Sequence, residues 1–333
     1  MDSLTQIVLG AAVGEAVLGR RVGNKAMLYG AIAGTIPDLD VLSKHFVDTV
    51  TATEMHRGFS HSIFFSVLFA PVFGWMISKV ERRSRATAKD WSWLMFWGLI
   101  THPLLDAFTT WGTQLFWPFD IRLAFQSIFV IDPLYTLPFL VCLVLAMFHK
   151  RTSAKRRKLN DLGLKISSIY LLLTLVLKAA SFYQFDRNLK EQGIDYREMN
   201  TRPSPFNTLL WSANIDVGDA YLIADYSFFD TQGIQFKRYP KNRDLLGNLQ
   251  KNDKLKRLTE ISEGWYTIQK KDDRLYFNDL RFGLMSLNPD EERFAFSYLL
   301  SPKNGDVKVK EIPRDRGDAK KLLSALWKRI WGN

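Results

Sequence analysis

The chain has 333 residues, of which 47% are hydrophobic, and its formal net charge is +11 at pH 7. The positive charge gathers in three short clusters between apolar runs, at residues 20–25, 80–90 and 149–161. This distribution favours the cytoplasmic loops of a membrane protein and argues against a nucleic-acid partner. The single cysteine, Cys142, excludes an internal disulfide and a zinc–thiolate site, so a metal here would need His and carboxylate ligands.

Apolar runs in residues 1–184 predict a mainly α, polytopic membrane helix bundle, because a span needs roughly 20 mostly apolar residues. We expect about six hydrophobic helices. The runs are residues 3–19, 25–43, 63–80, 91–111, 128–148 and 162–182. The first two are rich in Gly and Ala, so both could pack closely inside the bundle, or one could be re-entrant or interfacial.

The basic clusters set the orientation of the predicted spans, since Lys and Arg favour cytoplasmic loops. With all three clusters inside, residues 44–62, residues 112–127 and everything after about residue 183 lie outside. The sequence thus predicts a multi-pass protein of the bacterial cytoplasmic (inner) membrane with an extracytoplasmic C-terminal part.

Under this topology, the sparse His and Asp residues of the apolar region converge on the outer side. His102 and Asp106 are four residues apart, so both leave one helix face. Ionisable groups at membrane depth are costly, and a divalent metal would make them mutually stabilising. The sequence therefore predicts a site for one or two divalent ions, zinc by ligand type or manganese. The candidate ligands are Asp38, Asp40, His56, His61, His102, Asp106 and Asp132.

Several of these residues also have a plain structural interpretation. Asp132 precedes a proline and could equally be a helix N-cap. The "PDLD" segment at residues 37–40 could be a helix-ending turn. His56 and His61 are five residues apart, so both could bind one metal only if a helix begins between them and Gly58 lets the preceding loop fold back.

Five segments, taken in order, resemble one known family. They are "MDSLTQIVLGAAVGEAV", "GTIPDLDVL", "HRGFSHS", "THPLLDAFTTWGTQLFWPF" and "IFVIDPLYTLP". Across roughly residues 1–140 the chain resembles the YdjM-like family of membrane-bound predicted metal-dependent hydrolases. The resemblance implies a metal site formed by His56, His61, His102 and Asp106 with Asp38 and Asp40.

The "HRGFSHS" segment and the His-x-x-x-Asp pattern are also similar to bacterial zinc-dependent phospholipase C enzymes. This likeness is short, and the chain lacks further histidines that belong to the ligand set of that group. It therefore implies one or two metals here rather than three.

Residues 185–333 have the composition of a small soluble domain. Segments such as "AYLIADYSFFD" and "ERFAFSYLLSP" alternate apolar and polar residues between turn-forming ones, which predicts a β-rich (α+β) domain. The final "DAKKLLSALWKRIWGN" predicts an amphipathic helix with a basic face. This helix could lie on a membrane surface or pack against the sheet.

Together these features predict a membrane-bound hydrolase that uses metal-activated water to cleave a phosphoester at the outer face of the membrane. A site just below the outer surface suits a lipid-linked substrate. Asp38 or Asp40 could bridge two metals or act as the base. Arg57 and Arg122 could bind an anionic group such as phosphate, contact headgroups or form structural ion pairs.

The alternative is a non-enzymatic membrane scaffold or metal-carrying protein whose His/Asp cluster is structural. A site closed by four protein ligands favours that alternative, whereas three ligands and a water favour catalysis. A transporter is less favoured, because the sequence shows no internal repeat.

Overall fold

The computed structural model describes residues 1–285, 292–303, 306–313 and 319–333. The chain forms two compact units, and neither is continuous in sequence. The first comprises Met1–Ser43, Met55–Val176 and Pro205–Asn207, and the second comprises Lys44–Glu54, Leu177–Ser204 and Thr208–Asn333.

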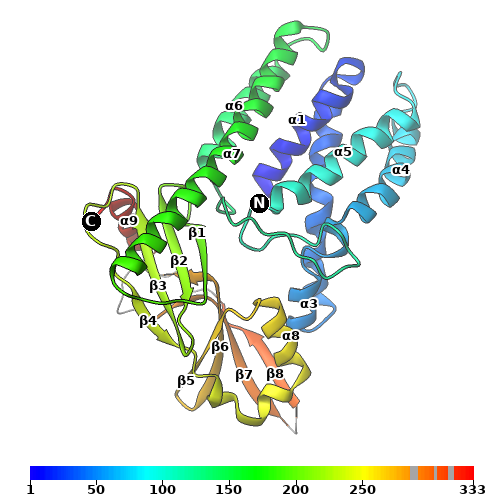
Figure 1. Cartoon of the computed structure of the whole chain (residues 1–333). Coiled ribbons are helices and arrows are strands. Elements are labelled where there is room, and N and C mark those ends of the chain that lie inside the picture. The colour runs from blue at the N-terminus through cyan, green and yellow to red at the C-terminus, as the bar shows by residue number, and fades with distance from the viewer. Residues whose placement is uncertain (286–291, 304–305, 314–318) are drawn as a thin grey trace. The chain divides into compact units, whose positions relative to one another are not determined.

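The first unit is helical (Figure 1). Its α-helices are α1 (Ser3–Val22), α2 (Asn24–Thr35), α4 (Ile63–Val80), α5 (Ala88–Asp106), α6 (Pro133–Met147) and the first part of α7 (Ala154–Glu191). Two 3₁₀ segments, η1 (Ile36–His45) and η2 (Phe59–His61), precede and follow the excursion of the chain into the second unit.

Each of the six predicted apolar runs contains a helix, with three differences in extent. The second run is α-helical only to Thr35 and continues as η1, and the fourth ends at Asp106. The last lies within the 38-residue α7, which continues past residue 184. Among the described residues, α4 and α7 are long and apolar enough to cross a membrane. A bundle of about six spans therefore remains a prediction.

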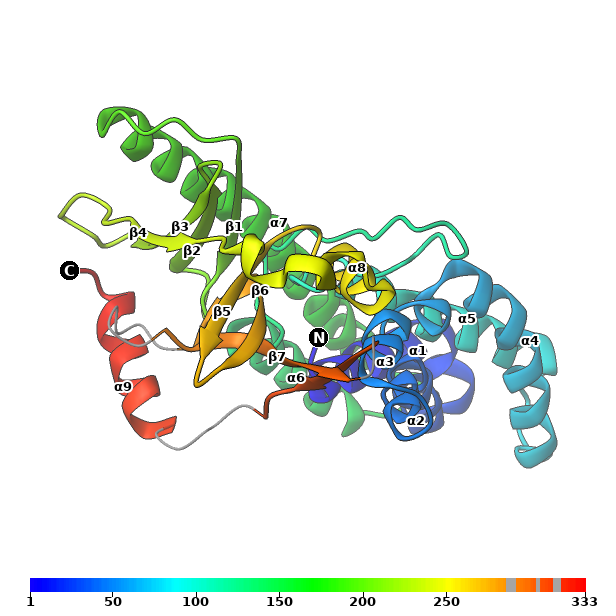
Figure 2. The same cartoon turned by 90° about the horizontal axis from the view of Figure 1, so that it is seen from below.

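Glycines bring α1 and α2 into close contact, and Figure 2 shows the two helices side by side. A Cβ atom on Gly10 would lie only 2.3 Å from the carbonyl oxygen of Gly30, and one on Gly34 would lie 2.5 Å from the carbonyl oxygen of Gln6. Small residues permit such backbone approach between helices in lipid. The close packing predicted for these Gly-rich runs is confirmed.

The three basic clusters meet at one end of the first unit. Arg21 pairs with Asp90 at 2.6 Å, and Lys25 pairs with Glu81 at 2.5 Å. Arg151 donates a hydrogen bond to the carbonyl oxygen of Arg21 at 2.7 Å. Since α1, α2, α4 and α5 each run from this end to the other, the segments at their opposite termini gather away from the basic loops.

The second unit contains two four-stranded antiparallel sheets, with strand orders β1-β2-β3-β4 and β5-β6-β7-β8 (Figure 1). The strands of the first are β1 (Glu198–Pro203), β2 (Leu210–Asp216), β3 (Ala220–Ser227) and β4 (Lys237–Pro240). Those of the second are β5 (Tyr266–Lys271), β6 (Arg274–Leu284), β7 (Phe294–Lys303) and β8 (Asp306–Glu311). The predicted β-rich character of this region is confirmed.

Helices cover these sheets. Phe185 and Leu189, on the last part of α7, are fully buried in the core of the first sheet. Two short helices, α3 (Thr49–Met55) and α8 (Asp253–Ile261), are connected by an ion pair between Glu54 and Arg257. Val50 of α3 is fully buried among the side chains of the second sheet. Lys44–Glu54, which lies between the Asp38 and His61 motifs in the sequence, is thus part of the second unit.

The C-terminal helix α9 (Ala319–Ile330) packs through Leu326 and Ile330 against Leu210 of the first sheet. Its other side leaves Trp327 and Trp331 more than half exposed. One face of the predicted amphipathic helix therefore packs on the sheet, and the aromatic face remains open.

Candidate metal centre

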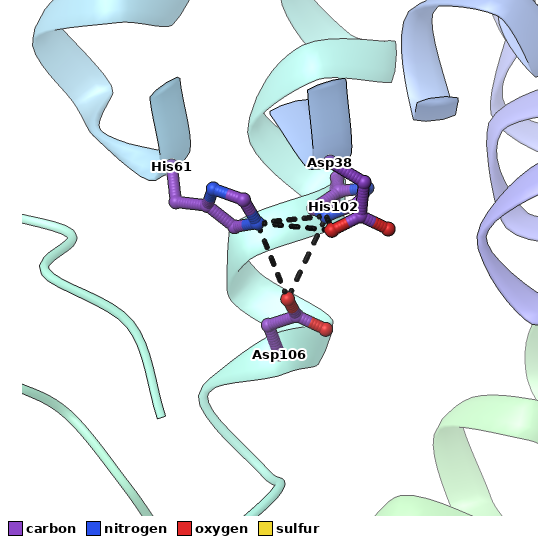
Figure 3. Close-up of side chains that lie close together, drawn as sticks. All are labelled: Asp38, His61, His102 and Asp106. Atoms are coloured by element: carbon purple, nitrogen blue, oxygen red, sulfur yellow. Dashed lines mark hydrogen bonds and ion pairs between the residues drawn. The ribbon is translucent and has the colours of Figure 1, made fainter. Parts of the chain in front are cut away.

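Four side chains of the first unit converge on one point (Figure 3). Asp38 comes from η1, His61 from the end of η2, and His102 and Asp106 from the last turn of α5. One donor atom from each residue lies within 4.8 Å of the other three. Such a group of two imidazoles and two carboxylates could hold a metal ion.

The distances between the donor atoms match a small coordination shell. The two Nε2 atoms of His61 and His102 are 3.1 Å apart. Asp38 Oδ1 lies 3.4 and 3.3 Å from these two nitrogens, and Asp106 Oδ2 lies 3.5 and 3.6 Å from them. Tetrahedral zinc with bonds of about 2.0–2.2 Å requires donor–donor distances of about 3.3–3.6 Å. The cluster is therefore the right size for a divalent ion at its centre.

Hydrogen bonds at the outer ring nitrogens direct both imidazoles inward. His102 Nδ1 lies 2.6 Å from the carbonyl oxygen of Gly34, which can only accept, so this nitrogen carries a proton, and Nε2 carries a lone pair when the ring is neutral. His61 Nδ1 lies 3.0 Å from Ser60 Oγ, which itself donates to Asp40 Oδ2 at 3.3 Å. The same assignment then places a lone pair on His61 Nε2. Two lone pairs facing each other at 3.1 Å repel unless a cation lies between them.

Asp106 is held by three groups that are also buried. Its Oδ1 accepts hydrogen bonds from Gln6 Nε2 at 2.9 Å and from the amino group of Met1. Its Oδ2 lies 3.0 Å from Arg57 Nε, but it has no hydrogen-bond partner among the described residues. This oxygen, which faces the two imidazoles, is therefore available to a metal.

The cluster is accessible from one side. The side chains of His61, His102 and Asp106 are fully buried, whereas that of Asp38 is 25% exposed. Next to it, Leu39, Val41 and Leu42 are each about half exposed. Any access of solvent or substrate is therefore on the Asp38 side, which also carries exposed apolar residues.

Asp40 and His56 lie around this cluster rather than in it. Asp40 Oδ1 lies 3.1 Å from His56 Nδ1, and Asp40 Oδ2 accepts from the backbone N–H of Arg57 at 2.7 Å and lies 3.4 Å from His61 Nδ1. Asp40 thus fixes the orientation of His61, as carboxylates do behind metal-binding histidines. His56 does not reach the four donor atoms.

The loop around Gly58 turns at the preceding residue. Arg57 has a left-handed backbone with φ of 58°, whereas Gly58 has φ of −93°. A Cβ on Gly58 would lie 3.0 Å from both Met55 O and Gln114 Oε1. The glycine therefore allows close approach of neighbouring groups, and η2 then carries His61 into the cluster.

The two arginines predicted to bind anions have protein partners. Arg57 is buried, and besides lying beside Asp106 it donates to Thr109 Oγ1 at 2.7 Å. Arg122 donates to the carbonyl oxygen of His56 at 3.4 Å and lies over the ring of Trp111. Arg57 thus has the structural ion-pair role that the sequence left open.

Asp132 is the N-cap of α6. Its Oδ1 accepts from the backbone N–H groups of Leu134 and Tyr135 at 2.9 and 3.2 Å, and its Oδ2 accepts from Tyr170 Oη at 2.9 Å. Asp132 is not among the four residues that meet at the cluster. Of the two interpretations of Asp132, a metal ligand or a helix N-cap, the structure shows the N-cap.

Two supporting groups were not predicted from the sequence. Gln6 is a polar residue in the first apolar run, and its position there could have indicated a polar partner inside the helical unit. Its side chain donates a hydrogen bond to Asp106. The carbonyl oxygen of Gly34 gave no signal, because a backbone acceptor is present at every residue.

Comparison with known protein families gives a match to the N-terminal half of the chain. A family model described as "YdjM inner membrane protein" matches residues 1–181. No curated protein and no solved structure matches the chain.

Proposed function

The chain belongs to the YdjM family of inner membrane proteins, and on that premise we propose that it is a membrane-bound metal-dependent hydrolase of phosphoesters. One observation carries the proposal: the four donor atoms of Asp38, His61, His102 and Asp106 converge, with the two imidazole Nε2 atoms facing each other at 3.1 Å. Zinc suits this ligand set and spacing, and manganese is the second choice.

A divalent ion held by these residues would supply Lewis acidity that activates a water and polarises a phosphoryl oxygen. The three buried ligands, His61, His102 and Asp106, form a rigid base for it, and Asp38 faces the accessible side. Asp38, the most exposed of the four side chains, would accept the proton of the attacking water. His56, which is one-third exposed and held by Asp40, could donate a proton to the leaving group.

The substrate class follows from the surroundings of Asp38. The exposed Leu39, Val41 and Leu42 would contact acyl chains, while the adjacent polar cluster would receive the phosphoester. A lipid-linked phosphoester combines these two properties in one molecule.

The proposed orientation places the basic loops in the cytoplasm and the metal centre near the outer face. It is supported by the three basic clusters, which meet at one end of the helical unit while the metal-site residues lie at the opposite helix termini. The helices would then form a multi-pass bundle, and the second unit would be extracytoplasmic.

A second candidate function is a structural or metal-carrying role. It is favoured by one observation, that four protein donors meet at the cluster, because a tetrahedral ion with four protein ligands has no open position. In that case the ion would join η1, η2 and α5, and no reaction would follow.

Cobalt substitution distinguishes the two functions. We would load the full-length protein in detergent with Co²⁺ and record its visible spectrum before and after adding inorganic phosphate. An open position predicts a spectral shift on adding phosphate and zinc-dependent hydrolysis of phosphoester lipids, both lost in His102→Ala. Asp120→Asn, an exposed carboxylate with no part in the cluster, is the matched control. An unchanged spectrum without hydrolysis would support the structural role instead.

A further inference from the structure

A polar cavity of about 480 Å³ lies in the first unit, between the end of α1 and the start of α7. This volume is within the range of roughly 300–1,000 Å³ typical of small-molecule sites. The cavity is lined chiefly by charged and polar residues, among them Glu15, Arg20, Arg151, Ser153, Arg157 and Asn160. None of them belongs to the metal centre, and the hydrolase mechanism uses none of them.

One of the two acidic residues of this lining, Glu15, is already neutralised. Glu15 forms a bidentate pair with the buried Arg156, with N–O distances of 2.6 and 2.5 Å. Arg156 also donates to Asn24 Oδ1 at 2.7 Å and to the carbonyl oxygen of His149 at 3.0 Å, so its guanidinium is fully engaged. Glu15 therefore does not compete for the remaining cations.

The remaining cations around the cavity are weakly paired. Arg20 is exposed and has no ion pair or hydrogen bond among the described residues. Arg157 lies 3.8 Å from Asp161, and both side chains are substantially exposed. Arg151 uses one nitrogen to donate to a backbone carbonyl. Three guanidinium groups against one exposed carboxylate leave a net positive cavity, which is suited to bidentate binding of a phosphate.

The lining of the cavity includes a buried asparagine with an unpaired acceptor atom. Asn160 is 2% exposed, and its amide nitrogen donates to the carbonyl oxygen of Ala12 at 3.0 Å, which fixes the direction of the amide. Its Oδ1 has no hydrogen-bond partner among the described residues. A buried amide oxygen without a partner is costly, and a hydroxyl group of a ligand would satisfy it.

We propose that this cavity binds a phosphate ester that carries a hydroxyl group, as in the headgroup of phosphatidylglycerol. The phosphate would contact Arg20 and Arg157, and the hydroxyl would donate to Asn160. The cavity lies at the basic end of the unit, about 21 Å along α1 from Gln6 at the metal centre, counting fourteen residues. It is therefore a site separate from the metal centre, and the same chemistry could come from a membrane lipid or from soluble glycerol phosphate.

The experiment is native mass spectrometry of the full-length protein in detergent. The probes are phosphatidylglycerol, phosphatidylmethanol (which has the same charge but no headgroup hydroxyl), phosphatidylcholine and soluble glycerol 3-phosphate. The test variant is Arg20→Gln/Arg157→Gln. The control is Arg82→Gln/Arg83→Gln, which removes the same charge from two exposed residues outside the cavity.

We expect the wild type to prefer phosphatidylglycerol over the other two lipids and the test variant to bind it roughly tenfold more weakly, as for the loss of a charge-assisted contact. The control should bind like the wild type, and metal content should be unchanged in both variants. Comparable binding of glycerol 3-phosphate alone would assign the site to a soluble ligand of the same chemistry. Equal binding by test variant and wild type, or equal loss in the control, would overturn the proposal.

Discussion

The Nε2 atoms of His61 and His102 face each other at 3.1 Å, and the hydrogen bonds at the opposite side of each ring leave lone pairs on both atoms when the rings are neutral. Carboxylate oxygens of Asp38 and Asp106 complete the group. Four electron-pair donors around one point are mutually repulsive, and a bound cation makes the arrangement favourable.

Replacing Asp40 tests its positioning role. Asp40→Asn keeps the size of the side chain but removes the charge that orients His61 and His56. We expect metal affinity to fall about 10- to 100-fold, as for other partners behind metal-binding histidines, with little change in helical content. Competition with a chromophoric chelator measures the affinity, and Asp120→Asn should leave it unchanged. An unaltered metal affinity in Asp40→Asn would show that Asp40 does not position His61 for metal binding.

Replacing Asp132 distinguishes a role as helix N-cap from a role as metal ligand. Asp132→Ala removes two hydrogen bonds to the start of α6 and the bond from Tyr170. The expected cost is about 0.5–2 kcal/mol of stability for the cap, seen as a lower thermal unfolding temperature in detergent. Metal stoichiometry should stay at the wild-type value. If the variant instead lost its metal while keeping its stability, Asp132 would have to be a ligand.

The contact between α1 and α2 should support the metal centre from a distance. Gly30→Leu would place side-chain atoms where a Cβ already comes within 2.2 Å of Gly10 O, so the helices must separate. Since α2 carries Gly34, whose carbonyl oxygen binds His102, we expect both a lower unfolding temperature and weaker metal binding. Gly233→Ala is the control, because its nearest non-neighbouring atom would be 3.9 Å away. Wild-type metal affinity in Gly30→Leu would contradict this coupling.

Acid should release the metal. An imidazole binds a metal only in its neutral form, so protons compete with the ion for His61 and His102. We expect affinity to decrease as the pH falls and to recover when the pH is raised. Equilibrium dialysis across this range measures the change. Affinity that stayed constant down to about pH 5 would argue against histidine ligands.

The sequence predicted the ligands that regular geometry brings together. His102 and Asp106 are one helical turn apart, so a helix alone places them on one face. The Asp38 and His61 motifs were correctly expected at the same end of the bundle, because the basic loops indicated the opposite end. Hydrophobic runs also located the helices, but composition did not show that α7 is one continuous helix of 38 residues.

Other features depend on the tertiary fold and have no local pattern. Asp40 and Asp38 are two residues apart in the same motif, yet one binds His56 and the other meets the cluster. A left-handed turn at Arg57 lies between the two loop histidines, of which His61 enters the cluster and His56 does not. Likewise, nothing in the sequence of α3 indicates that it packs in the second unit, since Val50 is an ordinary apolar residue.

Metal content shows whether the cluster of Asp38, His61, His102 and Asp106 holds an ion. Elemental analysis would be applied to the detergent-purified wild type and to His61→Ala/His102→Ala, each incubated with zinc and with manganese and then dialysed. We expect about one equivalent of tightly bound metal in the wild type and none in the double variant, with both proteins helical by circular dichroism. A folded wild type that remains metal-free after both incubations would contradict it, and the cluster would then be a hydrogen-bonded structural core.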